Sequence, residues 1–461
     1  MNKIRFYIAM AVAKLSVIAL KLLKRNASYL PGKIAIRLCP DFLGQLTPPK
    51  TVICVTGTNG KTTVSNLINS ILVQNGYNVT NNGLGSNVQA GVTTALLLDS
   101  TFTGKAKRDI AVLEVDERSS LRIYPFLKPD YLVVNNIMRD SLKRNAHTDF
   151  ISFIINEALP ETTKLILNAD DMICNTLGLK NKDRVYFGME AEKPETVAKQ
   201  YVQDIVYCPK CGGKLEAEYL RYNHIGRMHC TACGFASPTP DYAVTSIDRD
   251  SNLFTLVHNG ESKEYTLIND NIVNVYNFCG AIALLTEFGL THEQISKGFS
   301  ESKIVKSRYD HLDIGDHHIT MQLAKGQNPI ACARCYSYVS QCSGENKGLI
   351  ILVDDKGDNS GNSENVSWLY DCDYSYLTHP SIAQIVFAGP RCKDQYLRAL
   401  IAGVSADKIR CTPDFKGGAD VLDTKLSKDI FVLYDPYSLA EASYTKEKLI
   451  TKAKEAASNG N

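Results

Sequence analysis

The stretch TVICVTGTNGKTTVSNLINSILVQNGYNV, residues 51–79, constrains the fold of this chain more than any other segment. It reads as an apolar strand, a turn containing glycine, and a helix with apolar residues at helical spacing that ends near Gly76. Further short apolar runs, DIAVLEVDE, YLVVNNI and KLILNADD, follow with helical patterns between them. Alternation of this kind predicts an α/β domain with a parallel sheet.

The turn itself predicts a site for nucleotide phosphates. It consists of Gly57, Thr58, Asn59, Gly60, Lys61, Thr62 and Thr63. Backbone N–H groups at a helix N-terminus hold phosphate, the lysine can reach the β- and γ-phosphates, and the first threonine hydroxyl can bind Mg²⁺. Val55 stands where the general phosphate-loop pattern has its first glycine. A glycine turn without function is the competing interpretation, but Gly-Lys-Thr-Thr after a strand argues against it.

Magnesium needs oxygen ligands beyond one hydroxyl, and a carboxylate at the end of a neighbouring strand usually supplies them. Glu114, in AVLEVDE, is the best candidate, with Asp116 and Glu117 close behind it. A carboxylate after a strand is also common in solvated turns, so this assignment depends on the loop upstream. Together the two features predict ATP and Mg²⁺ as ligands.

A second chemical feature is a pair of C-x-x-C units within a predicted insert at about residues 201–240. The four thiols are Cys208, Cys211, Cys230 and Cys233. Four thiolates on two tight turns can close a tetrahedral structural zinc site, and metal binding can supply folding free energy to a short insert. The C-x-x-C of Cys332 and Cys335 has no matching second pair and is interpreted as coincidence. After the insert, residues 242–268 alternate like antiparallel strands joined by turns.

Zinc ribbons often bind nucleic acid, so a nucleotide-gated nucleic-acid-binding module is one alternative. The chain has 51 basic and 49 acidic residues and a formal net charge of +2, which gives no global field for a polyanion. The segment KLEAEYLRYNHIGRMH inside the ribbon also lacks a sustained basic stripe. We therefore expect the metal site to hold the insert together and expect no nucleic-acid partner.

The N-terminal stretch FYIAMAVAKLSVIALKLL, residues 6–23, resembles an anchor segment, but Lys14 interrupts it. We expect a docked or interfacial helix, with a membrane span or a cleaved signal as alternatives. The expected location is the cytoplasm, with the enzyme peripheral at the inner face of the membrane. The predicted domains are an N-terminal helical segment at 1–45, a central ATP-binding domain at 46–315, and a C-terminal α/β domain at 316–461.

The sequence TGTNGKTT resembles the signature of Mur ligases and folylpolyglutamate synthases, which use ATP to activate a carboxylate as an acyl phosphate. GSNVQAGVTTALL, LEVDE, LILNADD and NVYN resemble the same family in the same order. This resemblance implies a Mur-ligase-like fold for the central domain. It also implies that Asn274, Asn277 and Arg308 contact the nucleotide.

One subfamily resembles the chain in its four-cysteine ribbon: the MurT-type subunits of lipid II isoglutaminyl synthase. ENVSWLYDCDY, residues 364–374, resembles the S-W-[IL]-W-D stretch of their C-terminal domain. The resemblance implies that Asp371 completes the Cys-His pair of a GatD-like glutaminase partner, as a triad acid orients its histidine. Asp354, Asp355 and Asp358 lie upstream and remain alternatives for this role.

For the reaction, the resemblance implies ATP-dependent amidation of the D-glutamate α-carboxylate in the stem peptide of lipid II. The product would be D-isoglutamine, formed through an acyl phosphate with ammonia from the glutaminase. The chain shows no glutaminase signature of its own. The alternative enzyme is an amino-acid-adding Mur ligase or a folylpolyglutamate-type synthetase, which needs no glutaminase partner.

Overall fold

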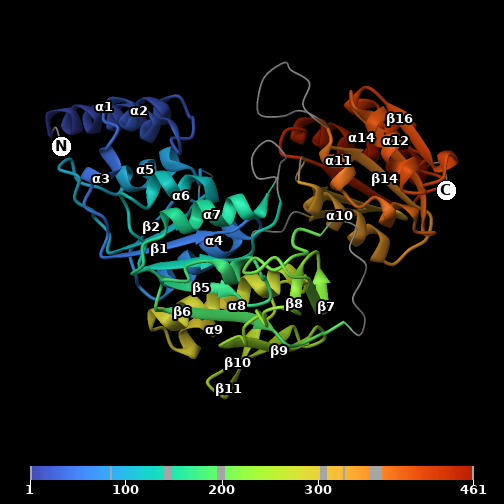
Figure 1. Cartoon of the computed structure of the whole chain (residues 1–461). Coiled ribbons are helices and arrows are strands. Elements are labelled where there is room, and N and C mark those ends of the chain that lie inside the picture. Colours follow the sequence, from blue (N-terminus) through green and yellow to red (C-terminus); the bar gives the residue numbers. More distant parts are fainter. Residues whose placement is uncertain are drawn as a thin grey trace. The chain divides into compact units, whose positions relative to one another are not determined.

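The structure is a computed structural model that describes residues 3–83, 86–139, 147–194, 203–301, 309–324, 326, 328–353 and 366–458. The chain divides into two compact units (Figure 1). The first unit comprises Met1–Met138, His147–Lys199 and Gln203–Lys303, and the second comprises Arg139–Ala146, Gln200–Val202 and Ile304–Asn461. Each unit is built around its own sheet.

A nine-stranded sheet forms the centre of the first unit, in the order β11-β10-β9-β6-β5-β4-β1-β3-β2. Its strands are β1 (Thr51–Thr56), β2 (Val79–Asn81), β3 (Ile110–Glu114), β4 (Tyr131–Val134), β5 (Lys164–Asn168), β6 (Arg184–Met189), β9 (Tyr242–Asp248), β10 (Leu253–His258) and β11 (Glu261–Thr266). From β2 to β9 all neighbours are parallel, and β10 and β11 continue the sheet in antiparallel pairs. The predicted parallel α/β sheet is confirmed.

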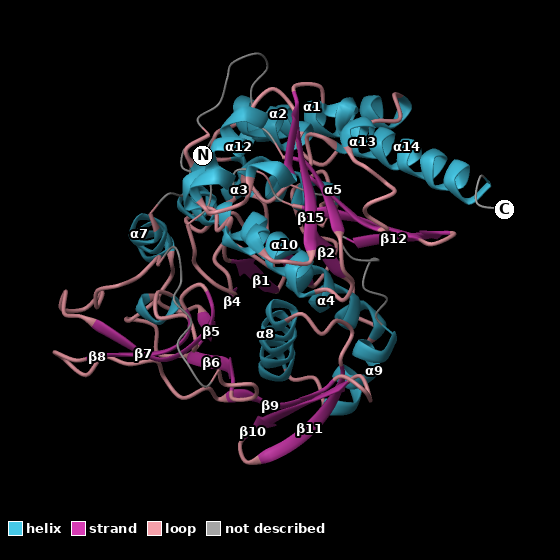
Figure 2. Ribbon diagram, turned by 90° about the vertical axis from the view of Figure 1, so that its right-hand side faces the viewer, coloured by secondary structure: helices cyan, strands magenta, loops and turns pink. Residues whose placement is uncertain are grey.

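Helices cover both faces of the parallel part of this sheet, which explains why β1, β3, β4 and β5 are apolar without alternation. The helices of the first unit are α1 (Lys3–Leu22), α2 (Leu30–Leu38), α3 (Phe42–Gln45), α4 (Lys61–Gln74), α5 (Gln89–Leu98), α6 (Ser120–Ile123), α7 (Thr148–Ala158), α8 (Ile272–Phe288) and α9 (His292–Glu301). Helices α4, α8 and α9 contact one another, and α4 and α8 lie against the sheet (Figure 2). On the other face, Val52 and Cys54 of β1 share a buried core with Met10 of α1 and Ile151 of α7.

The N-terminal helix α1 packs only one of its faces into this core. Phe6, Met10 and Val17 are buried there, whereas Ile4, Leu15 and other apolar side chains on the opposite face are exposed. Among the residues that the structure describes, no helix has both the length and the apolar character needed to cross a membrane.

The cysteine insert forms a separate two-stranded hairpin, with β7 at Leu215–Tyr222 and β8 at Ile225–Cys230. The alternating segment that follows it supplies β9, β10 and β11 as antiparallel neighbours, as its pattern predicts. These three strands extend the main sheet, because β9 pairs in parallel with β6 at Phe187 and Tyr242. Along the chain, the insert therefore lies between β6 and β9, which are neighbours in the same sheet.

The second unit is a six-stranded sheet in the order β12-β13-β17-β14-β15-β16. Its elements are β12 (Tyr309–Ile314), β13 (His317–Leu323), α10 (Pro329–Gln341), β14 (Lys347–Leu352), α11 (Trp368–Asp371), β15 (Ile382–Ala388), α12 (Cys392–Ile401), β16 (Ile409–Thr412), α13 (Gly418–Val421), β17 (Asp429–Tyr434) and α14 (Leu439–Ser458). All pairs except β12 with β13 are parallel. One face packs on α10, α11 and α12, and the other on α13 and α14. The C-terminal α/β fold is confirmed.

Candidate active site

The loop between β1 and α4 has the backbone shape that a phosphate site needs. Gly57 and Gly60 have positive φ angles of 124° and 85°, a region that side chains with a Cβ rarely adopt. A Cβ placed on Gly60 would lie 2.1 Å from Asn277 Oδ1. Glycine is therefore required at this position, and the loop presents bare backbone at the N-terminus of α4, where partial positive charge favours anions.

Residues that follow β4 hold this loop in place. The backbone carbonyl of Asn136 accepts from Thr58 N at 2.8 Å, and its side-chain Oδ1 accepts from Asn59 N at 3.0 Å. Thr58 Oγ1 accepts from Met138 N at 2.8 Å and donates to Met138 O at 3.0 Å. The side chain of Asn135 donates to Asn59 O at 3.3 Å. Asn135 and Asn136 are not among the predicted site residues. The feature of the sequence that could have identified them is a pair of asparagines directly after an apolar strand.

Lys61 pairs with a buried carboxylate. Its Nζ lies 2.9 Å from Glu117 Oε1, and the exposed fractions of the two side chains are 12% and 2%. Burial acts to lower the pKa of Lys61, but the carboxylates of Glu117 and Glu114 outweigh it and raise the pKa above its usual value. The ammonium group is therefore charged and fixed at the loop, because its Nζ also donates to Gly57 O.

Thr62 and Glu114 meet as a candidate magnesium site. Thr62 Oγ1 donates to Glu114 Oε2 at 2.7 Å, and Asn87 Nδ2 donates to Glu114 Oε1 at 2.9 Å. The backbone of Glu114 is fixed by Asn82, whose Oδ1 accepts from Glu114 N and whose Nδ2 donates to Glu114 O, both at 2.8 Å. A hydroxyl and a carboxylate held side by side are the oxygen donors that Mg²⁺ prefers, so the residues present fit this ion.

The other predicted nucleotide contacts lie on three different parts of the chain. Thr63 is half-buried in the first turn of α4. Asn277 of α8 is 3% exposed and faces Gly60, and its Nδ2 lies 3.3 Å from Asn274 Oδ1. Asn274 donates to Asn269 Oδ1 at 2.8 Å. The structure thus brings Asn277 to the loop and places Asn274 beside Asn277. Arg308 lies outside the described residues.

The four cysteines of the insert form one cluster. Their sulfur atoms all lie within 4.8 Å of one another, and these residues are the single such group found among the described residues. Cys208 and Cys233 have sulfurs 3.7 Å apart, and Cys211 and Cys230 have sulfurs 3.5 Å apart. A tetrahedral zinc with Zn–S bonds of about 2.3 Å separates its sulfurs by about 3.8 Å. The cluster therefore fits a structural zinc.

In the second unit, Asp371 ends the short helix α11. Its side chain is 29% exposed and lies 3.4 Å from Arg139 Nη1. The backbone on both sides of it is held by the buried Arg398, whose Nε donates to Leu369 O at 3.0 Å and whose Nη2 donates to Cys372 O at 2.9 Å. The alternative acids Asp354, Asp355 and Asp358 lie outside the described residues.

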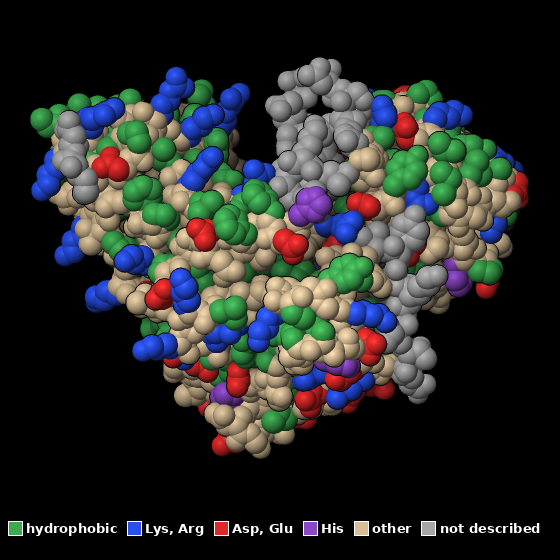
Figure 3. All heavy atoms as spheres, in the orientation of Figure 1, with side chains coloured by type: hydrophobic (Ala, Val, Ile, Leu, Met, Phe, Trp, Pro, Cys, Tyr) green, Lys and Arg blue, Asp and Glu red, His purple; other side chains and the backbone are tan. Residues whose placement is uncertain are grey.

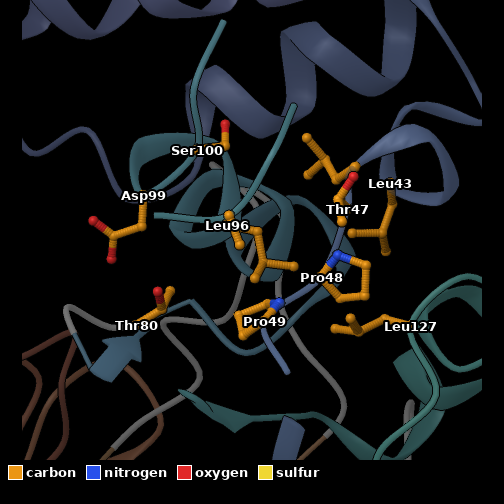
Figure 4. Close-up of a pocket in the computed structure, with 11 residues that line it drawn as sticks. Leu43, Thr47, Pro48, Pro49, Thr80, Leu96, Asp99, Ser100 and Leu127 are labelled. Carbon is orange, nitrogen blue, oxygen red and sulfur yellow. The ribbon is translucent and has the colours of Figure 1, made fainter. Parts of the chain in front are cut away.

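A small pocket in the first unit is separate from this site (Figure 4). Pro48 and Pro49, which precede β1, line it together with Leu43 and Leu96. It therefore lies at the opposite end of β1 from the phosphate loop. Its one carboxylate, Asp99, is paired with Arg108 at 3.0 Å. Because its lining is mainly apolar and its carboxylate is already paired, we assign this pocket no catalytic role.

The fold and the loop define the class of protein. The model of the Mur ligase middle domain matches residues 55–225. Among solved structures, a pseudomurein peptide ligase type C from Methanothermus fervidus aligns with a TM-score of 0.66 at 20% identity, covering 90% of this chain and 81% of that one. MurF from Thermotoga maritima aligns with a TM-score of 0.57 at 14% identity, covering 92% and 85%. The fold is that of the Mur ligases.

Sequence relatives define the family more narrowly. The model of the MurT ligase C-terminal domain matches residues 325–438. The MurT subunit of lipid II isoglutaminyl synthase (glutamine-hydrolyzing) from Staphylococcus aureus strain COL is 32% identical over 91% of this chain and 93% of its own length. The Streptococcus pneumoniae R6 subunit of the same name is 29% identical over 88% and 90%. The chain belongs to the MurT family and is an ATP-dependent ligase.

Proposed function

We propose that this enzyme amidates the α-carboxylate of D-glutamate in the stem peptide of lipid II, with ammonia from a GatD-like glutaminase partner. The observation that carries the proposal is the combination of a complete phosphate loop in the first unit with a partly exposed Asp371 in the second. The names of its relatives, lipid II isoglutaminyl synthase (glutamine-hydrolyzing) subunits, support the substrate and the ammonia source. The function rests on chemistry that both units contribute.

The first step makes the carboxylate reactive. A carboxylate oxygen attacks the γ-phosphorus of ATP, the bond to the bridging oxygen breaks, and ADP leaves behind an acyl phosphate. The bare backbone of Gly57 and Gly60 and the N-terminus of α4 bind the phosphates, and the charged Lys61 neutralises the γ-phosphate. Thr62 and Glu114 would hold Mg²⁺, which screens phosphate charge when bound. Ammonia then attacks the acyl carbon, phosphate departs, and the amide loses a proton.

The acids near the loop have separate tasks. Glu117 is buried against Lys61 and keeps that ammonium oriented, whereas Glu114 is held by Asn82 and Asn87 with its carboxylate turned to Thr62. Asn277 of α8 supplies an amide beside the loop, and Asn274 supports it through a hydrogen bond, so that these amides can contact the nucleotide. Within the described part of the chain, Lys61 is therefore the cation for phosphate, Glu114 is the carboxylate for metal, and the asparagines provide amides for orientation.

For the ammonia supply, we assign Asp371 to the glutaminase reaction. A triad acid accepts from the imidazole of its histidine, fixes the tautomer, and stabilises the imidazolium that forms. A carboxylate on a short helix, with Arg398 fixing the carbonyls of Leu369 and Cys372, has the rigid backbone that such a role needs. The chain contributes this acid to a histidine of the partner subunit.

The decisive experiment is reconstitution with a class I glutaminase of the GatD type. The pair should convert lipid II to its amidated form in the presence of ATP, Mg²⁺ and glutamine, and this chain alone should do so with ammonium salts. Mass spectrometry of the product measures a decrease of about one mass unit as –OH becomes –NH₂. Product that instead gains an amino acid, without any need for the glutaminase, would identify the enzyme as an amino-acid-adding ligase.

We also propose that α1 places the enzyme on an anionic membrane surface, where lipid II resides. One face of the helix exposes apolar side chains: Ile4, Ile8, Val12, Leu15, Ile18 and Leu22. Lysine and arginine recur through the first forty residues, and no acid occurs before Asp41. Figure 3 shows Lys and Arg side chains beside apolar ones over α1 and α2. An apolar face flanked by cations is typical of interfacial helices.

Vesicle flotation tests this membrane proposal. The enzyme should float with vesicles that contain about one-third phosphatidylglycerol and bind pure phosphatidylcholine more weakly. The double variant Ile8→Ser and Leu15→Ser should bind at least about tenfold more weakly, because burial of each side chain contributes about 2 kcal/mol. Leu397→Ser, which changes an exposed leucine of α12, is the control. Equal binding by both variants would show that α1 does not contact the membrane.

A further inference from the structure

The two ends of the β7–β8 hairpin have different environments. At one end stand the cysteines, where Cys230 of β8 pairs with Leu215 of β7. At the other end, Asn223 and His224 connect the strands, and His224 is 1% exposed. Figure 2 shows the hairpin beside β5 and β6. The turn is therefore buried against the ATP-binding domain, although hairpin turns usually face solvent.

His224 is held between two carboxylates. Its Nε2 lies 3.1 Å from Asp171 Oδ1, and its Nδ1 lies 3.6 Å from Asp204 Oδ2. Burial acts to lower the pKa of His224, but the charges of Asp171 and Asp204 outweigh it and raise the pKa to about 10. The side chain is therefore an imidazolium at neutral pH, and it neutralises a carboxylate that is 0% exposed.

Asp171, which follows β5, connects the hairpin turn to the phosphate loop. Its Oδ2 accepts from Ile137 N at 2.7 Å, while its Oδ1 is shared between His224 and Ile173 N, the latter at 2.9 Å. The residue after Ile137 is Met138, whose N–H and carbonyl both bond to Thr58 Oγ1. Hydrogen bonds, joined by the peptide bond between Ile137 and Met138, thus connect the ribbon turn to the loop that presents backbone to phosphate.

A second contact anchors the same end of the hairpin to the sheet rather than to the loop. Arg221 Nη2 donates to the carbonyls of Met189 and Ala191 at 2.8 Å, and its Nη1 lies 3.6 Å from Asp170 Oδ2. Gly226 N also donates to Asp170 O at 2.8 Å. These bonds attach the hairpin firmly, so His224 has a fixed position from which to orient Asp171.

We propose that His224 is a positioning residue for the phosphate loop, and that the docked ribbon turn sets the nucleotide affinity of the enzyme through Asp171, Ile137–Met138 and Thr58. The inference rests on the proposed function, because it requires this loop to bind ATP. It gives the ribbon a role beyond its own fold. By thermodynamic reciprocity, nucleotide bound at the loop must in turn stabilise the docked ribbon.

Nucleotide affinity of the full chain measures this role directly, by calorimetric titration with ADP and Mg²⁺. His224→Leu, which removes both charge and donor, should weaken binding at least about tenfold. His224→Gln retains an N–H donor near the position of Nε2 and should recover much of that loss. His229→Leu, on the same hairpin but half-buried and away from Asp171, is the matched control and should bind within about twofold of wild type.

A double-mutant cycle separates positioning from a loss of general stability. Thr58→Val removes the hydroxyl that bonds to Met138, and it should weaken ADP binding far less in the His224→Leu background than in wild type. Additive effects of the two changes would overturn the proposal. Wild-type chain that binds no ADP would instead overturn the proposed function, so the two failures are distinguishable.

Hydrogen exchange gives a second readout of the same role. In His224→Leu, amides in a peptide covering residues 131–138 should lose protection, whereas β3 at Ile110–Glu114 should keep its own and so show that the variant is folded. Unchanged exchange at 131–138, together with unchanged ADP affinity, would show that His224 only fills its cavity.

Discussion

The phosphate loop of the first unit and the Asp371 turn of the second unit are constructed in opposite ways. The loop lies among partners from its own unit: Glu117 fixes Lys61, Glu114 fixes Thr62, and the segment after β4 fixes Thr58. Asp371 has a firmly held backbone but a carboxylate that is 29% exposed. The first site thus has its charged side chains fixed by buried or hydrogen-bonded neighbours, whereas the carboxylate of Asp371 is partly exposed beside Arg139, as our proposal that it serves a partner requires.

The sharpest test of this contrast is Asp371→Asn. If the acid serves only a partner's histidine, glutamine-dependent amidation should fall by about 10⁴-fold, because the amide supports the wrong imidazole tautomer. Ammonia-dependent amidation should stay within about twofold of wild type. Asp373→Asn, which changes the carboxylate that caps Ser375 N, is the neighbouring control. Equal loss of both activities would place Asp371 in the ligase reaction instead.

Lys61→Met tests the phosphate loop, which is the other site in this comparison. Loss of the ammonium that we propose to bind the γ-phosphate should reduce amidation by about 10³-fold with glutamine and with ammonia alike. Lys50→Met is the control, because Lys50 is 83% exposed and pairs with Asp109 in a surface contact. Parallel assays with the two nitrogen sources measure the effect. Activity retained with ammonia would mean that phosphate is bound elsewhere.

Arg398→Met tests whether the Asp371 turn depends on its backbone support. The change leaves the carbonyls of Leu369 and Cys372 without their donor, which should lower the free energy of unfolding by about 2–4 kcal/mol. Below the melting temperature, glutamine-dependent activity should fall more than ammonia-dependent activity, because Asp371 lies between these two residues. Denaturant titration and the paired assays check both effects. A proportional fall in both activities would indicate only fewer folded molecules.

The smallest expected effect, at most about 1.4 kcal/mol for each pH unit, is the pH dependence of the His224 contact. A histidine whose pKa rises from about 6.5 unfolded to about 10 folded stabilises the protein fully below pH 6.5 and loses that contribution as pH rises to 10. The stability advantage of wild type over His224→Gln should therefore shrink between these values, by at most about 1.4 kcal/mol per pH unit. Urea titrations across this range measure it. An advantage that grows with pH would contradict a charged His224.

Much of the fold followed from local patterns. Apolar strands alternating with helical segments predicted the parallel sheet, and the glycine turn after residues 51–56 predicted the start of α4. The antiparallel strands after the ribbon were also predicted, but their place in the main sheet was not. Pairing between β6 and β9 joins residues on either side of the insert, and no periodicity within either strand encodes its neighbour.

The contacts of the site also differ in whether the sequence predicted them. Glu114 was predicted as the metal ligand, whereas Asn82 and Asn87, which orient it, were not. Glu117 was noted only as a nearby acid, yet it is the partner of Lys61. Each of these contacts joins residues from different strands or loops. Their proximity depends on the sheet order, in which β1 lies between β3 and β4.

The sequence by itself determined the groups whose geometry is local: the glycine loop with its lysine and threonine, and the cysteine pairs that each occupy one tight turn. Only the tertiary structure decided that the ribbon turn is buried at Asp171, because His224 and Asp171 belong to separate elements. A buried ion pair needs both partners removed from water at one place, and that place exists only after β5 and the hairpin have packed together.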